Sequence, residues 1–140
     1  QKFVTTGQWA KNSDTNHDYA FIRLYRNAQK RLVQDLTGAR GISFSQARNT
    51  TYRSFGYPAD RPFNGSRLYA CDSRYAGYGS GTTMGIGCDM TGGSSGGSWL
   101  RGGTSVNSVN SYGYAHQPRM MYGPYFGGTI KGMYDRIKGA

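Results

Sequence analysis

Glycine is the residue type that most restricts how this chain can fold. The 140 residues include 22 glycines and 12 tyrosines. Glycine destabilises helix interiors and permits tight turns, whereas aromatic residues favour strands. The sequence therefore predicts an all-β protein of short strands and tight turns, long enough to bury one hydrophobic core.

Short apolar or aromatic runs, each flanked by turn-forming residues, indicate where those strands lie. Seven such runs cover residues 19–25, 41–44, 50–55, 67–71, 83–88, 98–101 and 106–112. Their number and spacing are typical of a β-barrel or a β-sandwich.

The C-terminal segment has a different periodicity, which predicts one apolar face of a short helix. We expect Thr129 to be the N-cap of this helix and Gly139 to end it. Four residues recur at the spacing i, i+3, i+4 and i+7, namely Ile130, Met133, Tyr134 and Ile137.

The formal charge of +10 attracts anionic partners, and arginines interleaved with tyrosines are compatible with nucleic-acid binding. The arginines are spread singly along the chain, however, and form no basic run. We therefore expect a solvated basic surface and no nucleic-acid partner, while a basic secreted binding module stays an alternative.

Two observations bear on the cellular compartment. No stretch approaches the roughly 20 apolar residues of a membrane-spanning helix, and residues 1–4 lack a signal-peptide core, so we expect a soluble protein with no membrane partner. Cys71 and Cys88 have no plausible histidine partners nearby, which favours one disulfide over a zinc site. Because disulfides persist in oxidising compartments, the expected localisation is secreted and extracellular.

The segment with the strongest chemical signal is Gly92-Gly93-Ser94-Ser95-Gly96-Gly97-Ser98-Trp99. A serine between glycines can occupy a tight turn in which its hydroxyl is exposed and backbone N–H groups converge on one point. A nucleophile in acyl transfer needs these features. Runs of Gly and Ser are also common in flexible loops, but strand-like residues lead into and out of this one.

The longer run Cys88-Asp89-Met90-Thr91-Gly92-Gly93-Ser94-Ser95-Gly96-Gly97-Ser98-Trp99-Leu100 resembles the nucleophile loop of chymotrypsin-fold serine proteases, particularly the secreted bacterial trypsin-like and glutamyl-endopeptidase-like branches. The resemblance implies two antiparallel β-barrels with the active site between them. It makes Ser95 the nucleophile and the N–H groups of Gly93 and Ser95 the oxyanion hole of a serine endopeptidase. No metal or cofactor is implied.

Further segments resemble the same family, from about residue 14 to the C-terminus. In Asn16-His17-Asp18-Tyr19-Ala20-Phe21-Ile22-Arg23-Leu24 an aspartate opens an apolar strand, so Asp18 corresponds to the residue that orients the catalytic histidine. Ser111-Tyr112-Gly113 has the family's spacing for the strand that pairs with the substrate backbone. We expect residues 1–45 to end the N-terminal barrel, 46–126 to form the C-terminal barrel and 127–140 to form the helix.

The histidine that completes the family's catalytic triad has no match in this chain. His17 directly precedes Asp18, so on an extended segment the two side chains point to opposite sides and the imidazole cannot bridge Asp18 to Ser95. His116 lies in an expected loop where the family has no catalytic base. We therefore expect a heterodimer in which a separate N-terminal chain of the same protease supplies the histidine, while a fragment or a non-catalytic homologue stays an alternative.

The resemblance also bears on specificity and activation. The family's specificity pocket has its base about six residues before the nucleophile, at Asp89, where a buried carboxylate favours substrates with Arg or Lys; an aspartate there can instead be structural. Glutamyl-specific relatives carry a histidine where this chain has Asn110. Members activated by a buried ion pair carry an aspartate where this chain has Ser94, so that activation is not expected.

Overall fold

The computed structural model describes residues 2–139, which consist mainly of strands and loops. The strands are β1 (Lys2–Thr5), β2 (Ala20–Arg23), β3 (Gly41–Ile42), β4 (Thr51–Gly56), β5 (Tyr69–Tyr78), β6 (Met84–Ile86), β7 (Ser98–Arg101), β8 (Ser105–Val109), β9 (Tyr112–Tyr114) and β10 (Gln117–Gly123). The helical segments are α1 (Gly7–Asn12), the 3₁₀ turn η1 (Thr15–His17), α2 (Val33–Thr37) and α3 (Gly128–Lys138). The predicted all-β class with one C-terminal helix is confirmed.

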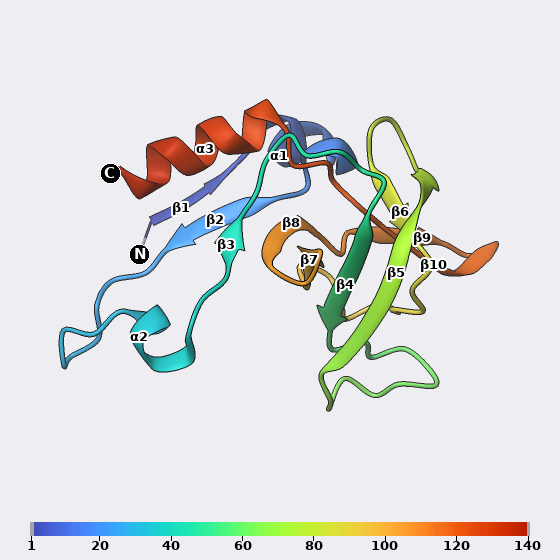
Figure 1. The fold of residues 1–140 in the computed structure, drawn as a ribbon, viewed down its shortest axis with the longest axis horizontal. Coiled ribbons are helices and arrows are strands. Elements are labelled where there is room, and N and C mark those ends of the chain that lie inside the picture. The colour runs from blue at the N-terminus through green and yellow to red at the C-terminus, as the bar shows by residue number, and fades with distance from the viewer. Residues whose placement is uncertain (1, 140) are drawn as a thin grey trace.

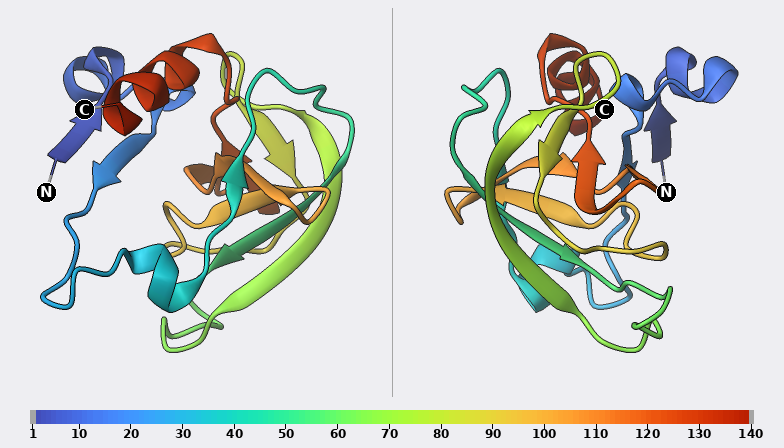
Figure 2. Two further views of the ribbon diagram at one scale, coloured as in Figure 1. Left: turned by 60° about the vertical axis from the view of Figure 1, so that its left-hand side comes forward. Right: turned by 90° about the vertical axis from the view of Figure 1, so that its right-hand side faces the viewer.

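Eight strands form one sheet in the order β3-β8-β7-β4-β5-β6-β10-β9, and β1 pairs with β2 in a separate two-stranded sheet. The β3–β8 pair is parallel, and the other pairs are antiparallel. The large sheet curls on one side of the molecule, whereas β1, β2 and α3 lie on the other (Figures 1 and 2). Because β3 pairs with β8, residues 41 and 42 belong to the large sheet. The domain boundaries predicted after residues 45 and 126 stay predictions.

Each side of the molecule has its own apolar cluster. The cluster inside the large sheet contains Tyr52, Met84, Ile86, Cys88, Met90, Trp99 and Met121. The cluster beside α3 contains Tyr19, Phe126, Ile130 and Met133. Together they position the loops that lie between the two sides.

The helix α3 packs against β1 and β2 through its apolar face, where Ile130, Met133 and Ile137 are buried as predicted. The predicted N-cap was wrong: Gly127 occupies that position and no side chain caps the helix, while Thr129 already lies in the first turn. Gly139 is the C-cap, which confirms the predicted end. None of the helices in residues 2–139 has the length and apolar character needed to cross a membrane.

The strand predictions were accurate in position and less so in length. The run at 98–101 matches β7, but the run expected at 67–71 covers only the start of the ten-residue β5. Strands β1 and β10, the short helices α1 and α2 and the turn η1 were not predicted. Helix α1 depends on a local cap, because the Thr6 hydroxyl accepts a 3.0 Å hydrogen bond from the N–H of Trp9.

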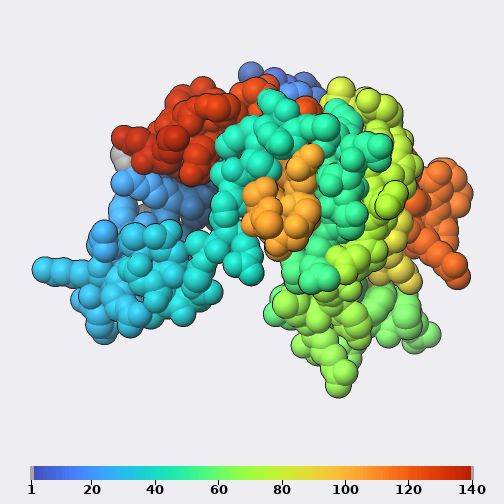
Figure 3. Space-filling model, viewed as in Figure 1, coloured from blue at the N-terminus to red at the C-terminus, as the bar shows by residue number. Residues whose placement is uncertain are grey.

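Residues 24–40 form an arm that projects from the molecule between β2 and β3 (Figures 1 and 3). The arm contains α2 and has exposed apolar side chains, with Tyr25 79%, Val33 51% and Leu36 53% exposed. On the neighbouring two-stranded sheet, Phe3 is 63% and Ile22 59% exposed. Large apolar side chains are thus exposed both on the arm and on the two-stranded sheet, and exposed apolar patches are typical of interaction surfaces.

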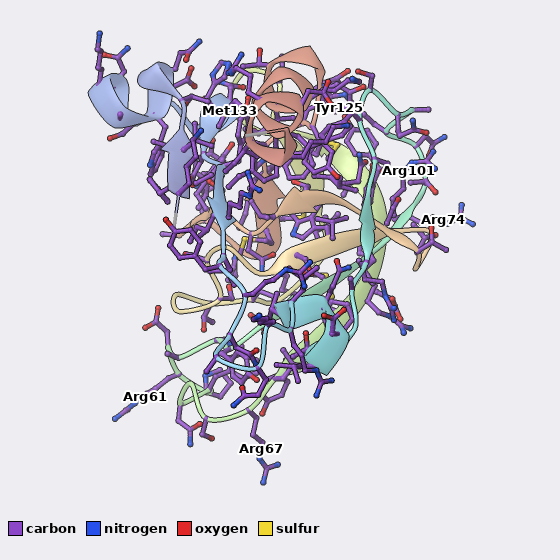
Figure 4. All side chains as sticks on the ribbon, turned by 90° about the vertical axis from the view of Figure 1, so that its left-hand side faces the viewer. Arg61, Arg67, Arg74, Arg101, Tyr125 and Met133 are labelled. Carbon is purple, nitrogen blue, oxygen red and sulfur yellow. A yellow bond between two sulfur atoms is a disulfide. The ribbon has the colours of Figure 1, made fainter. Side chains whose placement is uncertain are left out.

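The cysteines and arginines follow the sequence expectations. Cys71 and Cys88 form the predicted disulfide, with 5.8 Å between their Cα atoms. Arg61 and Arg67 project at one end of the molecule, and Arg74 projects from a different side (Figure 4). The positive charge is therefore distributed over the surface.

Candidate active site

Ser95 lies in the loop between β6 and β7, and its side chain is exposed. The preceding Ser94 is 2% exposed. Both the N–H group and the hydroxyl of Ser94 donate to the carbonyl of Thr91, at 3.3 Å and 2.8 Å. These bonds close a tight turn that buries a neutral hydroxyl at residue 94 and presents the next hydroxyl, that of Ser95, at the surface.

Two backbone N–H groups of this turn, at Gly93 and Ser95, donate no hydrogen bond within residues 2–139. Gly93 has a φ of +94°, which favours glycine, and the Gly92 carbonyl accepts a 2.7 Å bond from the N–H of Ala59. Because C=O and N–H point in opposite directions across a trans peptide, this bond turns the Gly93 N–H away from Ala59. Unbonded amides beside a nucleophile are what an oxyanion hole requires.

Asn110 connects the nucleophile loop to the large sheet and is 1% exposed. Its Oδ1 accepts from Ser54 Oγ (2.7 Å) and Trp99 Nε1 (2.6 Å). Its Nδ2 donates to the carbonyls of Phe55 (3.0 Å) and Ser94 (3.1 Å). All four hydrogen-bonding positions of the amide are used. Asn110 therefore fixes the position of the nucleophile loop relative to β4 and β7.

Asp18 lies between η1 and β2, and its Oδ2 accepts a 2.6 Å hydrogen bond from Ser111 Oγ. Two residues earlier, Asn16 Oδ1 accepts from the N–H (2.7 Å) and the hydroxyl (3.0 Å) of Thr82. Thr82 belongs to the turn between β5 and β6, whereas Ser111 directly precedes β9. The segment that carries Asp18 is therefore attached to the large sheet at two separate points.

A cavity of about 720 Å³ has both Asp18 and Ser95 in its wall. Most of the rest of that wall is apolar and includes Phe3, Phe21 and Phe126. The structure thus brings the two predicted triad residues to one cavity, with space beside both side chains.

Neither histidine occupies that space. His17 Nδ1 lies 2.9 Å from Asp14 Oδ2, and hydrogen bonds from Asn16 and then from His17 lower the pKa of Asp14. His116 lies in the turn between β9 and β10, with its ring centroid 5.3 Å from that of Tyr114. The walls of the cavities that contain Ser95 include neither imidazole.

A second cavity, of about 360 Å³, adjoins Ser95 on the other side. Its lining includes residues 90–92 of the nucleophile loop and also Ser111, Tyr112 and Gly113. The strand β9 is the last in the order of the large sheet, so one of its edges is unpaired. An edge strand beside a cavity can pair with an extended peptide and leave a side chain of that peptide in the cavity.

Asp89 does not line this second cavity, and its side chain is exposed. Burial alternates along the segment: Cys88 and Met90 are buried, so the residue between them points outward. Met90 lines the cavity, where the sequence had predicted the Asp89 carboxylate. The substrate-binding role predicted for Asp89 therefore has no support from this geometry.

Comparison with solved structures finds close matches over the whole chain. The thermostable serine protease AL20 from an extremophilic microorganism is 42% identical, with a TM-score of 0.89 over 98% of this chain and 65% of that protein. Protease Anisep from Arthrobacter nicotinovorans is 40% identical, with a TM-score of 0.89 over 100% of this chain and 66% of that protein. Over its whole length the chain is similar to serine proteases, and its fold is that of the chymotrypsin-fold enzymes.

A Glu endopeptidase, 17% identical with a TM-score of 0.80 over 100% of this chain and 63% of that protein, shares the chymotrypsin fold. The chain thus spans just under two thirds of the length of these structures. Neither a family model nor a curated protein sequence matches it. The fold class predicted from the nucleophile loop, a chymotrypsin-like double β-barrel, is confirmed.

Two residues of this serine protease fold matter at the site and were missed from the sequence. Asn110 was considered only as a departure from the glutamyl-specific pattern, although its buried amide organises the nucleophile loop. Asp60 was not considered, although it lines the second cavity. Buried amides leave no periodic signal, and Asp60 reaches the site only through the folding of a loop that precedes β5.

Proposed function

We propose that this chain is the nucleophile-bearing part of a serine endopeptidase that acts on polypeptide substrates. The carrying observation is the cavity shared by Asp18 and Ser95, with unbonded amides at Gly93 and Ser95 beside it. Ser95 attacks the peptide carbonyl and the two amides stabilise the oxyanion; the C–N bond then breaks, the amine leaves with the proton taken from Ser95, and water hydrolyses the acyl-enzyme to the free acid. The similar serine protease structures support the same chemistry.

The proposal assigns the base that takes the Ser95 proton to a histidine on a separate N-terminal chain of the same protease. One Asp18 oxygen is held by Ser111, and the other is available to orient an imidazole. The 720 Å³ cavity offers the space, and the exposed Phe3 and Ile22 offer an apolar surface beside it. The resulting enzyme is a heterodimer across that surface.

Two finer features complete the proposal. The disulfide between Cys71 and Cys88 supports a secreted, extracellular enzyme. A preference for Arg or Lys before the scissile bond is supported by the proximity of a carboxylate, that of Asp60, to the second cavity. The substrate strand in this proposal is Ser111-Tyr112-Gly113, at the free edge of the large sheet.

The direct test is labelling with a fluorophosphonate probe, which modifies an activated serine. The protein is purified without denaturation so that any associated polypeptide is retained, labelled, digested and examined by mass spectrometry. We expect a single modified residue, Ser95. Denaturing separation of the same material is expected to release a second, histidine-containing polypeptide.

Three variants make the labelling specific. Ser95→Ala is expected to abolish it, and Asp18→Asn to slow it by about 10⁴-fold, as expected when an aspartate no longer orients its histidine. Ser66→Ala removes an exposed loop hydroxyl outside both cavities and is expected to leave labelling unchanged. Absence of labelling beside a reactive control protease contradicts the proposal and favours a non-catalytic homologue.

A further inference from the structure

The second cavity changes in character from its exposed end to its buried end. Met90 and Met121 are 7% and 5% exposed and form an apolar floor. Asp60 is exposed and is the one residue with a charged side chain among those that line the cavity within residues 2–139. The cavity therefore has the buried side chains of Met90, Met121 and Ser94 at its inner end and a single negative charge at its rim.

The position of Asp60 is fixed by the nucleophile loop. Its N–H donates to Thr91 Oγ1 at 3.2 Å, and Thr91 Oγ1 donates in turn to the Asp60 carbonyl at 3.3 Å. A Cβ placed on Gly92 would lie 2.5 Å from Asp60 Oδ2, so the carboxylate lies against the backbone that precedes the Gly93 amide. A residue other than glycine at 92 would displace the carboxylate from this rim.

The Asp60 carboxylate has no cation to pair with inside the part of the chain that the structure describes. The ion pairs there engage Asp14, Asp72 and Asp135. In a chain with a net charge of +10, the unpaired Asp60 carboxylate places a negative charge beside the cavity. Such a site attracts a cation and disfavours a carboxylate ligand.

The ligand group that fits this arrangement has a flexible apolar stem and a cationic end. Methionine side chains adapt to alkyl stems, and long cationic side chains bury the stem while keeping the charged end near water. We propose that Asp60 is the residue that selects an Arg or Lys side chain of the substrate, by binding its charged end at the rim of the second cavity. This assignment rests on the proposed protease function and replaces the base position expected for Asp89.

Binding measured without hydrolysis tests the assignment independently of catalysis. The probes are Nα-acetyl-L-argininamide and its neutral isostere Nα-acetyl-L-citrullinamide, titrated into the purified protein and followed by NMR chemical shifts. Because the variant loses a charge-assisted hydrogen bond, Asp60→Asn is expected to weaken binding of the arginine probe by at least about tenfold. Binding of the citrulline probe is expected to change less than about twofold.

Asp89→Asn is the matched control, because it removes the same charge from an exposed residue outside the cavity. It is expected to leave the affinity of both probes within about twofold, since exposed charges at a distance are screened. Asp60→Glu, which keeps the charge, is expected to retain part of the preference for arginine. Thermal unfolding of each variant verifies that the fold is intact.

An unchanged arginine affinity in Asp60→Asn overturns the assignment, as does an equal loss in Asp89→Asn. Peptide substrates that differ only by Arg or citrulline before the scissile bond extend the test to the complete enzyme, in which kcat/KM for the Arg peptide is expected to fall in Asp60→Asn. Fluorophosphonate labelling of Ser95 reports separately on the proposed function. A labelled Ser95 with no dependence on Asp60 refutes only the specificity assignment, whereas cation binding without labelling refutes only the protease function.

Discussion

The side chain of Ser94 stabilises the nucleophile turn without a charged group from outside the turn. Ser94 is buried and uses its hydroxyl to hold the Thr91 carbonyl, so a neutral group stabilises the turn. The unbonded amides at Gly93 and Ser95 therefore exist without a buried ion pair. The nucleophile turn is organised by hydrogen bonds internal to this chain.

Substitution of Ser94 tests this directly. Ser94→Ala is expected to lower the free energy of unfolding by about 1 kcal/mol, through loss of one hydrogen bond. Ser94→Asp buries an unpaired charge and is expected to lower it by at least about 3 kcal/mol. Urea unfolding curves measure both. Wild-type stability in Ser94→Asp would mean that a cation lies within reach of this position.

Tyr19 gives the molecule a dependence of stability on alkaline pH. Burial raises the pKa of Tyr19 from 10.0 to about 12. A raised pKa in the folded state stabilises the fold below pH 10, and that contribution, roughly 3 kcal/mol, is lost as the pH rises through 12. Urea unfolding of wild type and Tyr19→Phe at pH 8 and pH 11 tests this. The free energy of unfolding is expected to fall less between the two pH values in Tyr19→Phe than in wild type. Parallel losses in the two proteins would contradict this.

Secondary-structure elements are held in register at the site by polar side chains from neighbouring segments. Asn110 alone joins the nucleophile loop, β4 and β7. Asn16 joins η1 to the turn between β5 and β6. The precision of the site therefore depends on two amides whose partners are distant in sequence.

Asn110→Ala leaves Ser54 and the Trp99 indole N–H without their acceptor inside the protein. Each unsatisfied buried group costs about 1–3 kcal/mol, so we expect a loss of roughly 2–4 kcal/mol in the free energy of unfolding. Chemical denaturation monitored by Trp fluorescence measures this loss. A loss below about 1 kcal/mol would show that water replaces the amide in the variant.

The sequence predicted the elements whose signal is local and missed those that depend on distant partners. The nucleophile turn and the apolar face of α3 follow from glycine placement and helical spacing. The prediction for Asp89 came from its distance to Ser95 in sequence; in the structure burial alternates along the segment, so Asp89 is exposed and Met90 lines the cavity. Asp60 lies 35 residues before Ser95, and only the folded loop brings it to the cavity.

On the scale of the whole molecule, an apolar surface covers the two-stranded sheet and the arm of residues 24–40. Phe3, Ile22 and Tyr25 are all more than half exposed on it. Of these exposed side chains, Phe3 also lies in the wall of the 720 Å³ cavity. Each side of the molecule nevertheless has a buried cluster, around Trp99 in the large sheet and around Ile130 beside α3.

Association with the histidine-bearing chain is expected to cover this surface. Ile22→Lys is expected to weaken that association by about tenfold or more, because it places a charge in an apolar interface. The stability of the large sheet is expected to be unchanged. Co-purification yield measures the association, and urea unfolding measures the stability. Undiminished association in Ile22→Lys would place the partner elsewhere.

The attachment of Asn16 to Thr82 has a consequence for protein engineering. Because Asn16 and Asp18 are hydrogen-bonded to the large sheet within this chain, a histidine-bearing chain of the kind proposed would need to supply only the imidazole. Histidine-bearing chains from related bacterial enzymes are then expected to restore hydrolysis with this chain, and the rate is expected to rise with the affinity of each one for it.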